Sequence, residues 1–131
     1  MSGKNFDGYV GISFAEKGRD RSGCDCWGLV RLVLREQFGQ DLPDLSDGYA
    51  TTKDADSILS LYEGEKSNWQ RVTDGQAGDV IVLRIKGRPT HVGIVIEPGR
   101  MLHVDRGIDA ATERYDGPHW RSRVEAIYRH R

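Results

Sequence analysis

The spacing of the apolar residues changes near Gly75, and this change limits the folds open to the chain. Before Gly75, apolar residues recur with the period of an α-helix. After it, they form short runs with the length and turn spacing of β-strands. Helices followed by hairpin-spaced strands are typical of an α+β protein in which helix packs on a mostly antiparallel sheet. Because 131 residues is close to the usual size of one domain, we expect a single domain over residues 1–131.

The clearest helical pattern begins at the second of the two cysteines in SGCDCWGLVRLVLREQFG. Asp25 is suited to cap this helix by accepting a backbone N–H, and Gly39 is suited to end it. The sequence therefore predicts a helix of about three turns that starts at Cys26. Its apolar face follows the spacing i, i+3, i+4, i+7, i+8 and i+12, at Cys26, Leu29, Val30, Val33, Leu34 and Phe38.

A weaker helical pattern and four strands are predicted farther along the chain. The second helix is expected around residues 55–62, ending at Gly64, and the segment DLPDLSDGY before it is expected to be a loop. The charged segment from Gly107 to Ser122 gives no clear prediction. The expected strands are Asp79 to Ile85, His91 to Ile96, Met101 to Asp105 and Val124 to Arg129.

Cys26 lies where a thiol can act as a nucleophile. A thiol attacks as the thiolate, which a helix N-terminus and a neighbouring imidazole both favour. His91 and His103 lie in two strands of one predicted hairpin, whereas His119 and His130 lie in charged surroundings and are interpreted as surface residues. The combination indicates a cysteine nucleophile with a histidine base, and leaves open that Cys26 only fills the core.

The two strand histidines can act together only if they share one face of the sheet. A simple two-residue turn would place His103 opposite Ile94 and put His91 on the other face. A three-residue loop at 97–99, or an equivalent bulge, pairs His103 with Gly93 and brings His91 to the same face, one diagonal step away. We expect that register.

Three segments resemble the NlpC/P60 family of papain-like cysteine peptidases. GCDCWGLVRLV is similar to the family signature in which Asp-Cys-Ser-Gly-Leu-Val opens the catalytic helix. GQAGDVIVL is similar to its Pro-Gly-Asp strand start, and HVGIVIEPGRMLHV to its histidine hairpin. The resemblance covers residues 6–106, with the three segments in the family's order.

This resemblance implies a papain-like fold, with the catalytic helix packed on the sheet, and a catalytic triad. Cys26 would be the nucleophile, His91 the general base and His103 the polar residue that orients the base. The activity implied is that of an endopeptidase that cuts the peptide stem of bacterial peptidoglycan between D-glutamate, through its γ-carboxyl, and the following diamino acid. The resemblance implies no metal and no other cofactor.

Two positions depart from the family pattern and bear on substrate binding. Trp27 stands where the family usually has a serine, which together with the preceding aspartate, here Asp25, helps to bind the free amino end of the stem peptide. The family's upstream tyrosine is best matched by Phe14, with Tyr9 as a less well-aligned candidate. We expect these four residues to contribute to substrate binding, with amine binding weakened.

The tryptophan variant, the small domain and the N-terminus together resemble the bacteriophage tail members of the family. The first residues, MSGKNFDGYVGISF, lack the apolar core of a signal peptide, so we expect synthesis in the host cytoplasm and incorporation into a virion at the tail tip. Other tail-tip proteins would be its partners. With 19 Lys and Arg against 20 Asp and Glu, no charge imbalance favours a nucleic-acid partner, and no segment is apolar enough to predict membrane insertion.

Alternatives to a catalytic thiol remain open on the sequence. Cys24, Cys26, His91 and His103 are the right number and types of ligand for structural zinc, although Cys-x-Cys is shorter than the usual spacing. A disulfide across one residue would be strained, and Cys24 is interpreted as a small buried hydrophobe. The domain could also be a structural tail-tip component with little or no peptidase activity, and an exposed apolar patch around Trp69 or Trp120 would favour that role.

Overall fold

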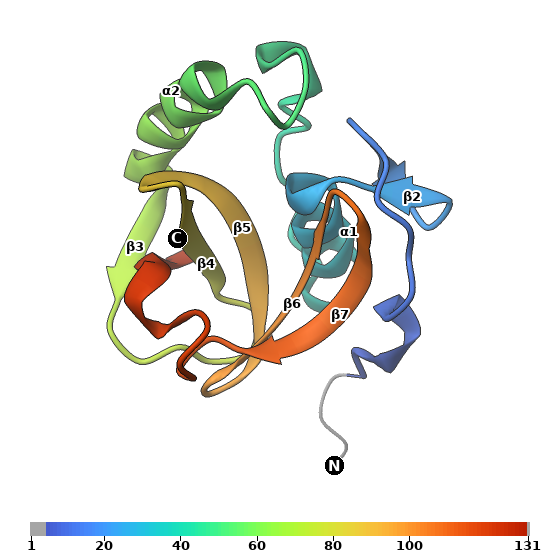
Figure 1. Cartoon of the computed structure of the whole chain (residues 1–131). Coiled ribbons are helices and arrows are strands. Elements are labelled where there is room, and N and C mark those ends of the chain that lie inside the picture. The colour runs from blue at the N-terminus through green and yellow to red at the C-terminus, as the bar shows by residue number, and fades with distance from the viewer. Residues whose placement is uncertain (1–4, 131) are drawn as a thin grey trace.

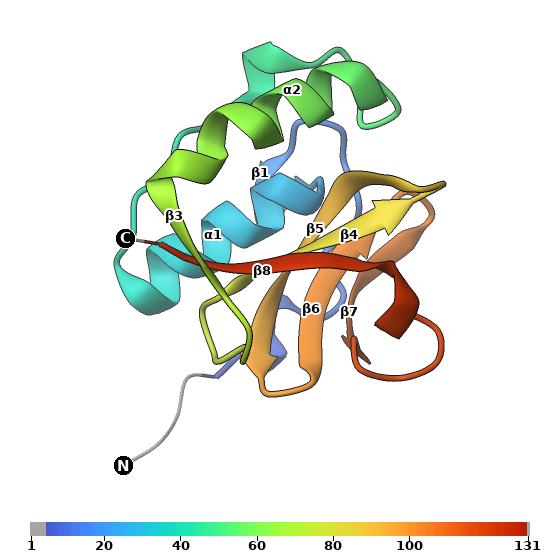
Figure 2. The ribbon, with the colours of Figure 1, turned by 90° about the vertical axis from the view of Figure 1, so that its left-hand side faces the viewer.

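The computed structural model describes residues 5–130, in which two helices pack on a six-stranded antiparallel sheet (Figures 1 and 2). Helix α1 spans Cys26–Phe38 and α2 spans Ala55–Glu65. The order of strands in the sheet is β3-β8-β4-β5-β6-β7. These strands are β3 (Trp69–Val72), β4 (Val80–Ile85), β5 (Arg88–Glu97), β6 (Arg100–Asp105), β7 (Ile108–Arg114) and β8 (Val124–His130). The predicted α+β class is confirmed.

Short elements complete the described part of the chain. A two-stranded ribbon of β1 (Arg19–Asp20) and β2 (Gly23–Cys24) precedes α1. Single 3-10 turns occur at η1 (Asp7–Tyr9), η2 (Ser46–Gly48), η3 (Lys66–Asn68) and η4 (Arg121–Arg123). Within residues 5–130, none of the helices has the length and apolar character needed to cross a membrane.

The sequence patterns miss the two outer strands of the main sheet. β3 and β7 are the edges of the sheet, where a strand has one hydrogen-bonded neighbour and carries little buried apolar surface. In β7 the sequence IDAATER has one buried residue, Ala110, so it lacks the alternation that marks a half-buried strand. The segment from Gly107 to Ser122 thus contains an unpredicted strand.

Helix α1 forms as its sequence predicts. The Gly28 N–H donates to Asp25 Oδ1 over 2.8 Å, which caps the start of the helix. Gly39 ends it in the left-handed conformation, at φ 65°, where a residue without Cβ is unstrained. The buried side chains of the helix contribute about 1.5–3 kcal/mol each to folding; they are Leu29, Val30, Leu32, Val33 and Leu34.

The two faces of the sheet carry different clusters. Side chains on one face pack with α1, and they include Val80, Val82, Ile94, Leu102 and Val104. The alternate side chains form the second cluster, which includes Ile81, Leu83, Val95, Met101 and Ile127 together with Tyr115 and Trp120. Because successive residues of a strand point to opposite faces, the odd-numbered histidines of β5 and β6 lie on the second face.

The register of the β5–β6 hairpin confirms the shared face of the histidines. Ile94 pairs with Leu102, and Glu97 pairs with Arg100, with a shift of one residue between Val95 and Glu97. The connection is therefore a two-residue turn plus a bulge, the equivalent of the expected three-residue loop. A Cβ placed on Gly93 would lie 3.2 Å from the Cβ of His103, as the predicted register requires.

Strands β5 and β6 separate beyond this short ladder. Their last pair is Ile94 with Leu102, and from there the two strands diverge, with the start of α1 at the opening between them (Figure 1). Both helices lie against β5 (Figure 2). This arrangement brings the first turn of α1 to the strand that carries His91.

Candidate active site

Cys26 is half-buried at the first residue of α1, and its thiol lies against β5. The backbone N–H groups of Val92 and Trp27 hydrogen-bond to it. Burial, followed by the negative charge of Asp25, raises the pKa of the Cys26 thiol to about 12, and the two N–H groups act in the opposite direction. Burial therefore opposes the thiolate that the helix start was expected to favour, and its effect on the pKa is the larger one.

His91 is the residue before Val92 on β5, and its imidazole is held by His103. The Val92 N–H contacts the sulfur of Cys26, and His91 Nε2 lies 2.9 Å from His103 Nδ1. Both histidines are almost fully buried, 3% and 2% exposed. The structure thus pairs the two predicted histidines, on the strand whose next backbone N–H contacts the Cys26 sulfur, and leaves the second ring nitrogen of His91, Nδ1, not engaged by His103.

Burial, and next the charge that His103 can carry, lower the pKa of His91. The carboxylate of Asp105 acts on both members of the pair, since it raises the pKa of His91 and that of the Cys26 thiol. Both shifts, upward for the thiol and downward for the imidazole, favour the neutral forms of Cys26 and His91.

Two further residues extend this cluster, and the sequence did not indicate either. Glu113 Oε2 lies 2.5 Å from His103 Nε2, and the Trp120 indole Nε1–H donates to Glu113 Oε1 over 3.2 Å. The Trp120 ring also stacks on His91, with 6.0 Å between ring centroids. Glu113 could have been identified if β7 had been predicted as a strand, because it lies two residues from Ala111, the register partner of His103.

Asp25 lines the cleft, but its carboxylate is used by the fold. It is 1% exposed and accepts hydrogen bonds from Arg19 Nη1 (2.7 Å), the Lys17 N–H, the Gly28 N–H and the Tyr49 hydroxyl. The ion pair with Arg19 balances its charge. This arrangement gives Asp25 a capping and anchoring role, and it does not favour the expected contact with a substrate amine.

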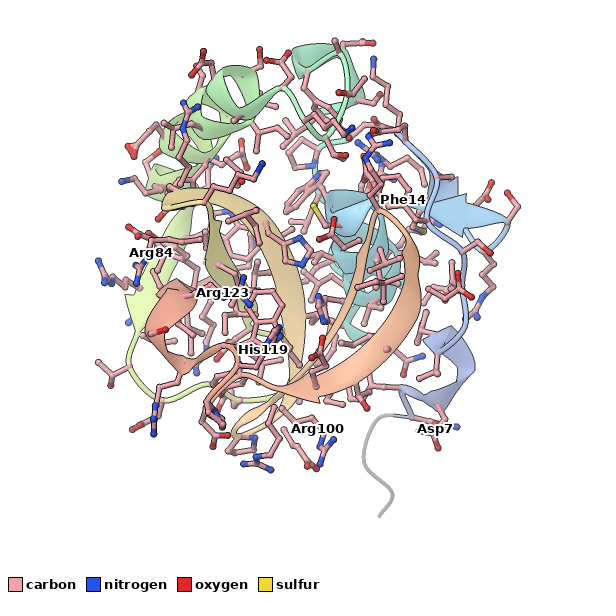
Figure 3. All side chains as sticks on the ribbon, viewed as in Figure 1. Asp7, Phe14, Arg84, Arg100, His119 and Arg123 are labelled. Carbon is pink, nitrogen blue, oxygen red and sulfur yellow. The ribbon has the colours of Figure 1, made fainter. Side chains whose placement is uncertain are left out.

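The other predicted substrate-binding residues divide into two groups. Trp27 lines the cleft beside Cys26 and donates its indole N–H to the Pro43 carbonyl. Phe14 does not line it and lies apart, under the guanidinium of Arg106 (Figure 3). Tyr9 is 1% exposed and donates to Glu36, which excludes it from the cleft. Three tyrosines that the sequence did not indicate line the cleft instead, namely Tyr49, Tyr62 and Tyr128.

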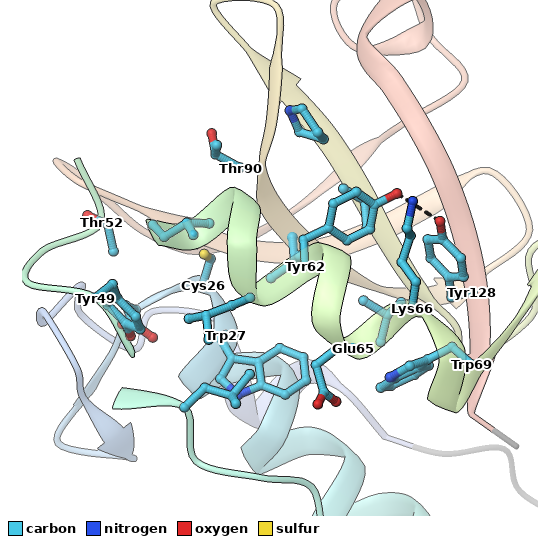
Figure 4. Close-up of a pocket in the computed structure, with 18 residues that line it drawn as sticks. Cys26, Trp27, Tyr49, Thr52, Tyr62, Glu65, Lys66, Trp69, Thr90 and Tyr128 are labelled. Atoms are coloured by element: carbon cyan, nitrogen blue, oxygen red, sulfur yellow. Dashed lines mark hydrogen bonds between the residues drawn. The ribbon is translucent and has the colours of Figure 1, made fainter. Parts of the chain in front are cut away.

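An apolar cleft of about 110 Å³ opens from Cys26 between α2 and the sheet (Figure 4). Helix α2 has no buried residue, because its inner side faces this cleft. At one end the hydroxyls of Tyr62 and Tyr128 are hydrogen-bonded over 2.7 Å. The apolar and aromatic lining residues are Trp27, Leu45, Tyr49, Ile58, Leu61, Tyr62, Trp69, Val80, Val82, Pro89, Val92 and Tyr128.

The two cysteines differ in their surroundings. Cys24 is fully buried, as predicted, and its thiol donates to the Asp20 carbonyl over 3.1 Å. Both cysteines are free thiols. The zinc alternative needs both of them to converge with the two strand histidines, and across residues 5–130 no three Cys, His, Asp or Glu side chains are placed to hold an ion.

The remaining aromatic and histidine predictions are mixed. His119 is exposed, as expected, and lies beside Arg123 (Figure 3). His130 is half-buried against Trp69. Trp69 and Trp120 are 6% and 5% exposed, so they form no apolar surface patch of the kind that would favour an interface.

Comparison with known proteins gives a consistent family. The model of the NlpC/P60 family matches residues 11–129. The chain is 26% identical over 122 residues to murein DD-endopeptidase MepS/murein LD-carboxypeptidase of Escherichia coli, covering 92% of this chain and 57% of that protein. It is 27% identical over 110 residues to tail tip assembly protein K of Escherichia phage N15, covering 82% of this chain and 45% of that protein. The chain thus spans about half the length of these curated relatives.

Solved structures show the same fold. An NLP/P60 family protein from Staphylococcus aureus superposes with a TM-score of 0.64 at 22% identity, over 93% of this chain and 37% of that one. The NlpC/P60 domain of the peptidoglycan hydrolase SagA superposes with a TM-score of 0.62 at 21% identity, over 93% of this chain and 90% of that one.

Proposed function

The chain belongs to the NlpC/P60 family, and on this premise we propose that it is a cysteine peptidase that hydrolyses an amide bond in the peptide stem of bacterial peptidoglycan. The observation that carries the proposal is the arrangement of its buried histidine pair. His91 Nε2 is held by His103 Nδ1 at 2.9 Å, on the strand whose next backbone N–H contacts the Cys26 thiol. A nucleophile, a base and a group that orients the base are the parts that thiol-based acyl transfer requires.

The proposed reaction is acyl transfer through a thioester. Cys26 Sγ attacks the carbonyl carbon of the substrate amide while His91 accepts the thiol proton at Nδ1. His91 then gives this proton to the leaving amine, and the C–N bond breaks. Water, with His91 as base, hydrolyses the thioester and restores the thiol. The Cys26 backbone N–H, at the start of α1, is our candidate for one oxyanion donor.

The neutral resting pair makes His91 a general base in this scheme. Because the pKa of the thiol is raised and that of His91 is lowered, the neutral pair is favoured over a thiolate–imidazolium pair before substrate binds. The proton must move during attack, and such transfer to a positioned histidine contributes about 10²–10⁴ in rate. The substrate would occupy the cleft that opens from Cys26.

The substrate class is supported by relatives that carry peptidoglycan activities in their names. MepS is named a murein endopeptidase and carboxypeptidase, and SagA a peptidoglycan hydrolase. Within this class we propose the D-glutamyl-γ-diamino acid bond as the site of cleavage. The Asp25–Arg19 pair argues against recognition of a free amino end, so we expect the enzyme to accept stems whose amino end is blocked.

We further propose that the protein acts in a phage or phage-like tail tip. The similarity to tail tip assembly protein K of phage N15 supports this location. A structural or assembly role in the tail tip, with weak or no peptidase activity, is the second candidate function and rests on the same similarity. Other tail-tip proteins would be partners in either case.

The two candidate functions separate in one experiment. Purified protein and its Cys26→Ala variant are incubated with defined stem peptides, γ-linked and D,D-cross-linked, with free and blocked amino ends, and the products are identified by mass spectrometry. We expect cleavage by the native protein and none by the variant. Intact substrates in both samples, with assembly of particles unimpaired, would overturn the enzymatic proposal in favour of the structural one.

A further inference from the structure

A carboxylate contacts the second ring nitrogen of His103, the one that does not face His91. Glu113, on the edge strand β7, places Oε2 2.5 Å from His103 Nε2, and its Oε1 accepts the Trp120 indole N–H at 3.2 Å. Both carboxylate oxygens of Glu113 are therefore engaged, one by the His103 imidazole and the other by the Trp120 indole. We propose that Glu113 is a positioning residue that sets the proton positions of both histidines, an inference that rests on the proposed catalytic function.

The first step of the argument concerns His103. An ionised carboxylate only accepts hydrogen bonds, so His103 Nε2 must carry the proton that lies between them. Burial acts to raise the pKa of Glu113, but hydrogen bonds from His103 and Trp120 hold it below its ordinary value, so the group is ionised at neutral pH. A neutral His103 with its proton on Nε2 has a lone pair on Nδ1.

The second step concerns the position of the proton on His91. Its Nε2 lies 2.9 Å from His103 Nδ1, and when that atom accepts, as it does in the neutral form of His103, His91 Nε2 donates. A neutral imidazole has one N–H, so Nδ1 of His91 then carries a lone pair. The proposed base nitrogen is therefore free of a proton only because a carboxylate lies two residues farther along the chain of hydrogen bonds.

Trp120 holds the hydrogen-bonded residues His91, His103 and Glu113 in place. Its ring stacks on His91 and meets His103 edge-on, with centroids 6.0 Å and 5.4 Å away. The guanidinium of Arg123 lies 4.1 Å above the outer face of the same ring. The indole can only donate, so it fixes the orientation of the Glu113 carboxylate and leaves Oε2 for His103.

Removal of the carboxylate is expected to reverse the donor and acceptor in the hydrogen bond between His103 and His91. Without an acceptor at Nε2, His103 gains by moving its proton to Nδ1 and donating to His91 Nε2. His91 must then carry its proton on Nδ1 and can no longer accept one from the thiol. Proton transfer to a positioned histidine contributes about 10²–10⁴ in rate, so we expect kcat to fall by up to that factor with KM nearly unchanged.

The test uses Glu113→Gln and Glu113→Ala, with Glu125→Gln as the matched control. The side chain of Glu125 is 33% exposed against 37% for Glu113, and it pairs with Arg84 outside the site. In Glu113→Gln the new amide cannot satisfy both neighbours, because turning its oxygen to His103 points its NH₂ at the indole N–H. Glu113→Gln keeps the shape of the side chain, so it still tests the proposal if the alanine variant does not fold.

The direct readout is histidine ¹⁵N NMR at neutral pH, which distinguishes the two tautomers without requiring activity. We expect both histidines of the native protein and of the control to carry the proton on Nε2, and the Glu113 variants to show the Nδ1–H form at His91. An unchanged tautomer at His91 in both variants would overturn the proposal. If the tautomers change but no protein form cleaves a stem peptide, Glu113 keeps its role and the peptidase proposal fails.

Discussion

The guanidinium of Arg19 lies 2.7 Å from the buried carboxylate of Asp25, the residue that caps helix α1. Its other N–H groups donate to the carbonyls of Gly18 and Asp44 and to the Tyr49 hydroxyl. The pair therefore ties the short ribbon before α1 and the loop after it to the first turn of the helix. The position of Cys26 depends on this network.

Replacement of Arg19 by alanine is expected to destabilise the fold. It leaves the 1%-exposed carboxylate of Asp25 without its charge partner, and breaking a buried pair from one side typically costs about 3–5 kcal/mol. Urea unfolding measures the change in the free energy of unfolding. The control is Arg114→Ala, because Arg114 and its partner Asp116 are both 51% exposed, and such pairs contribute at most about 1 kcal/mol. Equal losses in the two variants would contradict the importance of the Arg19–Asp25 pair.

Alkylation of Cys26 is expected to accelerate with pH and to show no plateau near neutrality. Since burial raises the pKa of this thiol to about 12, the reactive thiolate fraction grows about tenfold for each pH unit below that value. The rate of alkylation by iodoacetamide, measured between about pH 6 and pH 10, checks this pH dependence. In Cys26→Ala the remaining thiol, Cys24, is fully buried, so labelling of the folded protein should disappear. A rate that levels off below about pH 8 would indicate a preformed thiolate pair and would contradict the neutral resting state.

Segments with a clear apolar period could be predicted from the sequence, whereas ion pairs between distant segments could not. The helix at Cys26 and the inner strands carry enough apolar residues to mark their period, whereas edge strand β7 carries one buried residue. The histidine register could be predicted because two imidazoles must share a face to act together. Glu113 and Arg19 could not, since an ion pair between distant segments leaves no periodic trace in the sequence.

Acid is expected to destabilise the protein through His91. The charged groups that face it are His103 and Arg123, which lower its pKa, and Asp105 and Glu113, which raise it, while burial is the largest effect and lowers it. Because the folded-state pKa lies below the unfolded value of about 6.5, the unfolded chain binds more protons as the pH falls. Stability from this group is therefore complete above about pH 6.5 and is lost below it, with a slope of up to about 1.4 kcal/mol per pH unit.

Unfolding by urea at a series of pH values checks this slope. We expect His91→Gln to flatten the dependence below about pH 6.5, and His119→Gln, at an exposed histidine, to leave it as in the native protein. A native-like slope in His91→Gln would assign the acid sensitivity to other groups.

A methyl group added at Gly93 is expected to separate the two histidines. Its Cβ would lie 3.2 Å from the Cβ of His103 and 3.2 Å from the backbone oxygen of Leu102, so the hairpin must shift to admit it. Overpacking of this kind typically costs about 1–3 kcal/mol, and a displaced His103 loses its hydrogen bond to His91. We therefore expect Gly93→Ala to lower kcat toward stem peptides more than it raises KM, and to lower the unfolding free energy as measured in urea.

The matched control is Gly64→Ala, since a Cβ there has no atom within 4 Å and the residue lies in helix α2. A glycine within a helix is less stable than alanine by about 0.5–1 kcal/mol, so this variant should be slightly more stable than the native protein, with unchanged kinetics. The two glycine substitutions are expected to have opposite signs because the methyl group meets His103 at Gly93, whereas at Gly64 it meets open space and only the helix preference for alanine acts. If Gly93→Ala retained native kcat, close approach of the two strands at this point would not be what holds the histidines together.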